Sequence, residues 1–172
     1  MLEKAKNIRL LILDVDGVLT SGVIYYGPQG HELKGFHIHD GLGIKLLQKT
    51  GVTVAVISGK TSSAVEKRIQ DLAIKHAYLG QEDKLPAYES LKQQLQLTDQ
   101  QIAFIGDDLP DLPLLRRVHL AVTVPQAPEV IKQRVDLITK NKGGKGAVRE
   151  VCELIMNAQG HYQTVIQSYL SR

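Results

Sequence analysis

The sequence contains little cysteine and few aromatic residues. It has one cysteine and no tryptophan, and Phe and Tyr make up 5% of the 172 residues. One cysteine cannot form an internal disulfide, and its rarity fits a reducing compartment. Because Cys152 lies within a helical pattern of apolar residues, we expect a small buried core residue there and not a reactive thiol.

Long apolar runs and blocks of one charge are also missing. No run approaches the roughly 18 apolar residues that a membrane span needs, and the first residues, M-L-E-K-A-K-N-I-R, lack the apolar stretch of a signal peptide. The 21 basic and 18 acidic residues give a net charge of +3 without a dense Lys/Arg block. We therefore expect a cytoplasmic protein that binds neither nucleic acid nor a membrane.

What is present is typical of a globular α/β domain. The sequence is 43% hydrophobic and 23% charged, and its length favours one domain over residues 1–172 with a substantial core. Strand-like apolar runs alternate with helical patterns, which predicts a Rossmann-like parallel sheet flanked by helices. The expected strands are Ile8–Leu13, Thr53–Ile57, His76–Leu79, Ile102–Ile105, His119–Ala121 and Leu137–Ile138.

Residues 22–38 depart from this alternation and predict a protruding β-hairpin with a Gly-Pro-Gln-Gly turn. Its segment Val23–Tyr26 is apolar or aromatic on both faces. A two-stranded hairpin is marginal alone, so it should pack on its own domain or on a neighbouring subunit. Helices are expected from Asp40 to near Gly51 and from Lys84 through Leu97. The tail, about 160–172, has no evident partner in the sheet.

One apolar run leads directly into two carboxylates. Residues 8–20 read I-R-L-L-I-L-D-V-D-G-V-L-T, as expected of a buried central strand. Ligands bind outside the carboxyl ends of such strands, and buried carboxylates are costly unless they are paired or bind a metal. Residues two apart in a strand share a side, so Asp14 and Asp16 should face one site, and Gly17 permits a sharp turn. An acidic turn is the structural alternative.

A second carboxylate group follows the strand expected at 102–105. Three aspartates within five residues, Asp107, Asp108 and Asp111, suit a hard cation with oxygen ligands such as Mg²⁺. The chain has no Cys/His cluster that would suggest zinc. We expect Asp107 to bind the metal. Asp108 and Asp111 should orient water, Lys84 or the backbone.

The run D-V-D-G-V-L-T resembles the first signature of the haloacid dehalogenase superfamily of phosphatases, and Ser58, Lys84 and Asp107 follow in the order of its other signatures. The resemblance implies that Asp14 is a nucleophile that becomes phosphorylated and that Asp16 is the general acid and base. It also implies that Ser58 and Lys84 hold the phosphoryl oxygens. Mg²⁺ would be bound by Asp14, Asp107 and the backbone carbonyl of Asp16. Taken alone, Ser58 could equally be a helix cap and Lys84 a surface lysine.

The intervals between these signatures are too short for a separate cap domain. With D-G-x-G-I after the hairpin and G-G-K-G-A-V-R-E-V near the end, the pattern resembles the branch that hydrolyses 3-deoxy-D-manno-octulosonate 8-phosphate in lipopolysaccharide precursor synthesis. The resemblance implies a homotetramer with its hairpins around the assembly axis and each site closed by a neighbour. The Gly-rich segment 143–146 and the tail could reach that neighbouring site, with Lys145 as a contact.

A sugar acid needs cationic partners for its carboxylate. By resemblance, the substrate-binding residues are expected to be His37, Ile38, His39, Asp40, Gly41, Lys45, Lys60, Arg68 and Lys84. Relatives usually carry Arg at the position of His39; if that Arg contacts substrate, affinity or pH dependence should differ here.

Two alternatives stay open at this point. The first is the same chemistry on a nine-carbon sialic-type acid phosphate, against which Lys60 argues, because those relatives tend to carry an acidic residue there. The second is a phospho-accepting receiver domain, which also combines Asp, Mg²⁺, Ser/Thr and Lys. A receiver has its lysine last, whereas Lys84 precedes the second acidic cluster.

Overall fold

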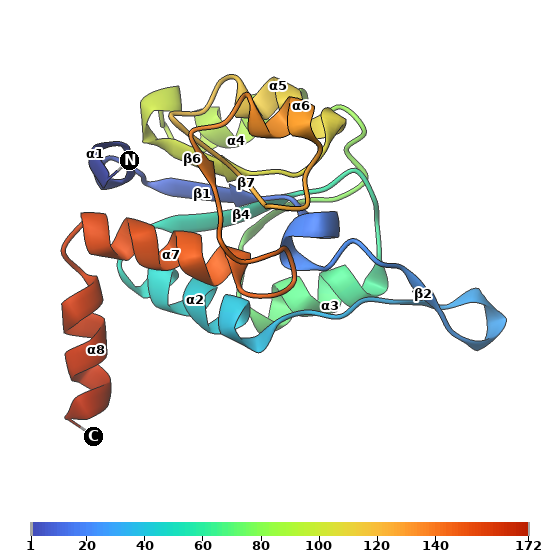
Figure 1. Cartoon of the computed structure of the whole chain (residues 1–172), viewed down its shortest axis with the longest axis horizontal. Coiled ribbons are helices and arrows are strands. Elements are labelled where there is room, and N and C mark those ends of the chain that lie inside the picture. The colour runs from blue at the N-terminus through green and yellow to red at the C-terminus, as the bar shows by residue number, and fades with distance from the viewer. Residues whose placement is uncertain (1, 172) are drawn as a thin grey trace.

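The computed structural model describes residues 2–171, so the ends of the domain predicted over 1–172 lie outside it. Six parallel strands form one sheet in the order β5-β4-β1-β6-β7-β8, and helices cover both of its faces (Figure 1). This confirms the predicted α/β fold. The strands are β1 (Leu10–Leu13), β4 (Thr53–Ile57), β5 (His76–Tyr78), β6 (Ile102–Ile105), β7 (Leu120–Thr123) and β8 (Leu137–Ile138).

Three predicted strands match their observed bounds, and the other three differ at their ends. The strand expected from Ile8 begins at Leu10, the one expected to end at Leu79 ends at Tyr78, and the one expected at His119–Ala121 is shifted to Leu120–Thr123. Apolar patterning locates a strand, but pairing with its neighbours decides where the strand ends. Leu10–Leu13, for example, pairs residue by residue with β4 and with β6.

The alternation of side chains along each strand builds a core on both faces of the sheet. Leu11 and Leu13 of β1 pack on one face, whereas Leu10 and Ile12 pack on the other. Helices α2 (Ile38–Lys49), α3 (Ser63–Asp71) and α7 (Ala147–Ala158) cover the first face, and α1 (Leu2–Lys6) packs beside α7. Helices α4 (Leu85–Gln94), α5 (Leu112–Leu115) and α6 (Glu129–Lys132) cover the second.

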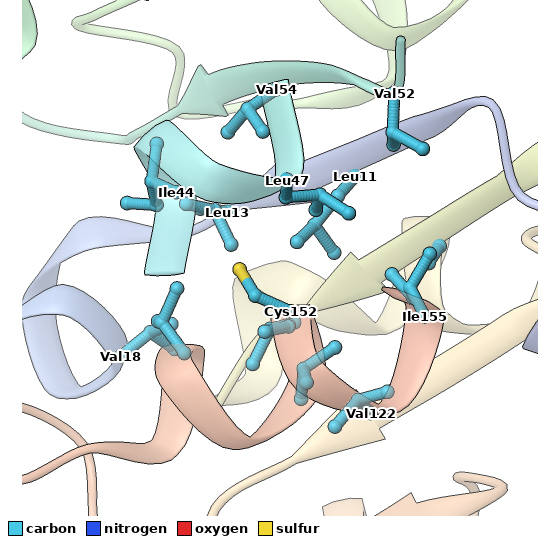
Figure 2. Close-up of a cluster of buried hydrophobic side chains, with 14 of the residues drawn as sticks. Leu11, Leu13, Val18, Ile44, Leu47, Val52, Val54, Val122, Cys152 and Ile155 are labelled. Carbon is cyan, nitrogen blue, oxygen red and sulfur yellow. The ribbon is translucent and has the colours of Figure 1, made fainter. Parts of the chain in front are cut away.

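Cys152 is a core residue, as predicted. Its side chain is fully buried and points from α7 toward Leu47 and Ile44 of α2 and Leu13 of β1 (Figure 2). Burial raises the pKa of the thiol well above its usual range. The residue therefore behaves as a small apolar side chain.

The predicted hairpin is present, and it projects from the body of the molecule (Figure 1). Its paired part is short: β2 (Tyr25–Tyr26) is antiparallel to β3 (Glu32–Leu33), with Pro28–Gly30 in the turn. The side chains of Val23, Tyr25, Tyr26 and Leu33 are each more than half exposed. Within residues 2–171, the hairpin and α2 fill the interval between β1 and β4, and no cap domain stands there.

Two predicted helices differ at one end. Helix α2 begins at Ile38, two residues before Asp40, because the Asp40 carboxylate accepts hydrogen bonds from the start of α7 instead of capping its own helix. Helix α4 ends at Gln94 and not at Leu97, because Gln96 takes a left-handed conformation (φ 54°) that its side chain does not signal.

The C-terminal tail forms helix α8 (Tyr162–Leu170), which packs on its own chain. Tyr162 and Val165 contact the core cluster, and the Tyr162 hydroxyl donates to Glu153 of α7 at 2.8 Å. Up to residue 171, the tail pairs with no strand of the sheet, as predicted. None of the helices in residues 2–171 is long and apolar enough to cross a membrane.

Candidate active site

The carboxyl ends of three neighbouring strands bring the predicted catalytic residues together. Asp14 follows β1, Ser58 follows β4 and Asp107 lies two residues beyond β6, at the point where the strand order reverses. The side chain of Lys84, at the start of α4, lies at the same edge of the sheet. A cavity of about 210 Å³ is lined by Asp14, Asp16, Ser58, Gly59, Lys60, Lys84, Asp107, Asp108, Pro110 and Asp111.

A tight turn directly after β1 positions the first two aspartates. The amide of Asp14 extends the strand pairing by donating to Ile105 at 3.0 Å, and residues Val15–Leu19 then form a wide helical turn. Asp16 therefore lies in the turn and not in the strand, so the expectation that strand alternation aligns it with Asp14 was wrong. The turn itself brings Asp16 to the cavity.

Gly17 makes this turn possible. Its φ is +91°, and a Cβ there would lie 2.0 Å from Oδ2 of Asp107. The glycine thus lets the Asp107 carboxylate pack directly against the backbone of the turn.

Lys84 lies between two buried carboxylates. Its Nζ is 2.5 Å from Oδ1 of Asp14 and 2.6 Å from Oδ1 of Asp111, and the Lys84 side chain is 3% exposed. Burial disfavours the ammonium, but Asp14 and Asp111 outweigh it and raise the pKa of Lys84. Lys84 is therefore a cation inside the site.

Asp111 organises the loop as well as the lysine. Its Oδ2 accepts hydrogen bonds from the amides of Asp107 at 2.8 Å and Asp108 at 3.2 Å. Asp108 in turn accepts from the Leu109 amide at 2.8 Å and starts a short 3₁₀ turn. Both aspartates thus contact the groups expected from the sequence, namely Lys84 and the backbone.

The remaining carboxylates fit a divalent metal. Oxygens of Asp14, Asp107 and Asp111 lie within 4.8 Å of one another. Asp111 is occupied by Lys84 and two amides, and Asp14 contacts Lys84 through Oδ1, so Asp107 and the second oxygen of Asp14 are the groups that would bind a cation. Burial, followed by the charges of Asp14, Asp111 and Asp108, raises the pKa of Asp107 to about 7. Burial, then Asp111, likewise raises that of Asp14. Such a cluster suits Mg²⁺, which prefers carboxylate oxygens.

Sequence reasoning missed Lys34. Its Nζ donates to Oδ1 of Asp16 and lies 2.7 Å from Oε1 of Glu32, and its side chain is 1% exposed. Burial opposes its charge, but these two carboxylates outweigh it and raise the pKa of Lys34. The alternation of Glu32, Leu33 and Lys34 was the available signal, since it places both charged residues on one face of the hairpin.

The predicted substrate-binding residues lie in several places. Lys60 lines the cavity described above. His37, His39 and Lys145 line a separate hollow of about 320 Å³ at the starts of α2 and α7. Arg68 lies beside that hollow, where its Nη2 donates to the His37 carbonyl at 3.1 Å.

Of the other four substrate-binding candidates, Asp40 and Gly41 have structural contacts within the chain. The buried Asp40 carboxylate accepts from the amides of Arg149 at 2.7 Å and Gly146 at 3.3 Å. A Cβ on Gly41 would lie 2.3 Å from Nη2 of Arg68. Ile38 and Lys45 are exposed. Their contacts with substrate stay predictions.

The glycine-rich segment packs on its own chain through Gly143 and Gly144, and a contact of Lys145 with a neighbouring site stays a prediction. The Gly144 amide donates to the Val18 carbonyl at 2.9 Å. A Cβ on Gly143 would lie 1.7 Å from the Gly17 carbonyl oxygen. The segment therefore supports the turn that carries Asp16.

Comparison with known proteins places these features in a family. A haloacid dehalogenase-like hydrolase model matches residues 80–151. The chain is 48% identical over 159 residues to a 3-deoxy-D-manno-octulosonate 8-phosphate phosphatase of Yersinia pestis, covering 92% of this chain and 85% of that protein. A protein of the same name from Escherichia coli K12 is 46% identical over 160 residues, covering 93% and 85%.

Solved structures agree. The phosphatase of that name from Moraxella catarrhalis, in complex with a magnesium ion, a phosphate ion and a KDO molecule, superposes with a TM-score of 0.95 at 42% identity, covering 98% of this chain and 97% of that one. A cobalt-bound Haemophilus influenzae relative has a TM-score of 0.92 at 42% identity, covering 97% and 99%. The chain therefore belongs to the haloacid dehalogenase-like hydrolases and, among them, to the 3-deoxy-D-manno-octulosonate 8-phosphate phosphatase family.

Proposed function

We propose that this protein is a Mg²⁺-dependent phosphatase that hydrolyses 3-deoxy-D-manno-octulosonate 8-phosphate to the free sugar acid and phosphate, a step that supplies a lipopolysaccharide precursor. The observation that carries the proposal is Lys84 held between Asp14 and Asp111, with Asp107 beside them at adjoining strand ends. Family membership supports the substrate, since a relative's structure holds magnesium, phosphate and KDO. A receiver domain does not belong to this family.

Asp14 is the nucleophile in this proposal. Its carboxylate attacks phosphorus and forms an aspartyl phosphate while the bond from phosphorus to the sugar oxygen breaks. Asp16 gives its proton to the departing oxygen and later takes one from the water that attacks the intermediate. That second attack releases phosphate and restores Asp14.

The other residues of the cavity bind the metal and the phosphoryl group and keep them in position. Asp14, Asp107 and the backbone carbonyl of Asp16 would bind Mg²⁺, which when bound offsets the negative charges that keep phosphate and carboxylate apart. Lys84 and the Ser58 hydroxyl would hold phosphoryl oxygens. Asp111 keeps Lys84 aimed at the site through its 2.6 Å contact.

Turnover of a panel of phosphorylated sugars and sugar acids tests the proposal. The wild-type protein with Mg²⁺ should prefer the eight-carbon acid phosphate and lose activity in excess chelator. Asp14→Asn should abolish turnover while leaving the fold intact, whereas Asp71→Asn, an exposed aspartate on α3, should not. Full turnover by Asp14→Asn would overturn the mechanism, and preference for a nine-carbon acid phosphate would overturn the substrate.

Lys60 should bind the carboxylate of the sugar acid. It lines the catalytic cavity, and a cation there suits the substrate carboxylate. Lys60→Glu should therefore weaken hydrolysis of the eight-carbon acid phosphate far more than that of an uncharged aryl phosphate. Equal losses on both substrates would remove Lys60 from the recognition site.

A homotetramer in the cytoplasm completes the proposal. The motivation is the hairpin, whose exposed Val23, Tyr25 and Leu33 would form a sizeable apolar surface on a monomer. Packing the hairpins together would also cover the free edges of β2 and β3. Cell fractionation tests the location, and light scattering tests the assembly.

A further inference from the structure

A lysine of the hairpin, Lys34, contacts the catalytic region. Tyr25 pairs with Leu33 and Tyr26 with Glu32, so alternation places Leu33 and Lys34 on opposite faces of the hairpin. The Leu33 side is open, with Leu33 57% exposed. The Lys34 side chain is 1% exposed and lies against Asp16 and Glu32. The hairpin thus turns a cation inward, toward the turn that follows β1.

The contact uses one of the two oxygens of Asp16. The Lys34 ammonium donates to Oδ1 of Asp16, and the same carboxylate lines the catalytic cavity. The Asp16 side chain is 30% exposed and has two rotatable bonds, so without a partner it could adopt several orientations. A charge-assisted hydrogen bond selects one of them.

A purely structural role for this pair would be to attach the hairpin to the body of the protein. Another lysine–aspartate pair between distant segments, Lys4 with Asp136 at 2.5 Å, is of that kind, because it joins α1 to the residue before β8. The Lys34 pair differs in its partner, which is the residue assigned to proton transfer. Loss of an attachment would affect all substrates alike, but loss of orientation would affect the step in which Asp16 acts.

We propose that Lys34 is a positioning residue for the reaction, holding Oδ1 of Asp16 so that Oδ2 presents the proton to the departing sugar oxygen. The inference rests on the proposed function. Lys34 belongs to the hairpin that we propose as the interface between subunits. The same hairpin would therefore also set the geometry of proton transfer. Glu32, whose Oε1 is 2.7 Å from Lys34, places a second negative charge beside the lysine.

Leaving-group dependence provides the test. An alkyl phosphate needs a proton on its departing oxygen, whereas p-nitrophenyl phosphate releases a phenolate that leaves without one. kcat/KM includes the steps up to departure of the alcohol, so it is measured for wild type, Lys34→Met, Lys34→Arg, Asp16→Asn and the double variant, with Mg²⁺. The alkyl substrates are the eight-carbon acid phosphate and a simple sugar phosphate. Lys4→Met is the matched control.

Lys34→Met should lose about 100-fold in kcat/KM on the alkyl phosphates, the size expected when a catalytic group is misplaced by about 1 Å. It should lose less than about threefold on p-nitrophenyl phosphate. Lys34→Arg should recover part of the alkyl activity, and Lys4→Met should match wild type. In the Asp16→Asn background, Lys34→Met should cause no further loss of leaving-group selectivity, because the two residues act as one unit.

Equal losses on alkyl and aryl substrates, or none on either, would overturn the inference and leave Lys34 as a structural attachment. If Lys34→Met fails to fold, Lys34→Arg and Glu32→Gln are compared in the same assay, and unchanged selectivity in both would also overturn it. A wild-type protein that prefers another sugar phosphate would contradict the proposed substrate alone. A wild type inactive on every phosphomonoester would overturn the proposed function, and this inference with it.

Discussion

Replacing Asp111 with alanine tests the central charge network of the site. The Asp111 carboxylate is 3% exposed and accepts three hydrogen bonds, from Lys84 at 2.6 Å and from the amides of Asp107 and Asp108 at 2.8 and 3.2 Å. Alanine would remove all three acceptors. Lys84 would retain Asp14 as its carboxylate partner.

The cost in stability follows from these contacts. Removing one partner of a buried ion pair costs about 3–5 kcal/mol, because the remaining charge and donors stay buried. Part of this is offset, since the negative charge of Asp111 also raises the pKa values of Asp14 and Asp107. We therefore expect a loss of about 3 kcal/mol in the free energy of unfolding. For a chain of this length, that corresponds to a fall in Tm of about 6–12 °C.

Activity should fall as well. With Asp111 gone, Lys84 should turn fully to Asp14 and neutralise the nucleophile. The expected loss in kcat is about 100-fold, similar to the removal of one donor from a preorganised site. Asp111→Asn should be intermediate in stability, because its amide nitrogen must face either Lys84 or a backbone N–H group.

Urea unfolding in chelator and turnover of p-nitrophenyl phosphate with Mg²⁺ measure the two effects. Asp71→Ala is the control. Its carboxylate pairs with Lys67 on the surface of α3, and its loss should change the free energy of unfolding by less than about 0.5 kcal/mol. An Asp111→Ala protein as stable as wild type would refute the network reasoning.

Three further predictions follow from burial and charge. Without metal, the free energy of unfolding should fall as pH rises from 3.8, the ordinary pKa of an aspartate, to about 7, the pKa of folded Asp107, because folded Asp107 keeps a proton that the unfolded chain has lost. Urea titrations at several pH values, with and without Mg²⁺, measure this. A free energy of unfolding that does not change with pH in the metal-free protein would contradict it. The Cys152 thiol, buried and of raised pKa, should resist a thiol reagent at pH 8 until urea unfolds the protein, so rapid labelling of native protein would count against its place in the core. Val23→Asp and Tyr25→Asp should dissociate the proposed tetramer in light scattering and lower activity together, and a fully active monomer would show that each chain closes its own site.

The sequence by itself determined the sheet and most of the catalytic cavity. Apolar runs ending in Asp14, Ser58 and the cluster at Asp107 place these residues at strand ends, and parallel strands bring their carboxyl ends to one edge. Lys84 was assigned by its order in the chain. The signals at Asp14 and Asp107 are local, which is why the pattern revealed them, whereas Ser58 and Lys84 needed the resemblance to the order of the family's signatures.

The tertiary structure decided the contacts between segments that are far apart in sequence. Lys34 looks like any hairpin lysine until folding brings its ammonium against the carboxylate of Asp16. Asp40 looks like a helix start, yet its carboxylate binds the beginning of α7. The partner of the glycines at 143 and 144 cannot be told from the sequence, and in the structure they allow close packing on the turn after β1. In each case, the partner is set by three-dimensional packing, and neither the spacing nor the type of these residues specifies that partner.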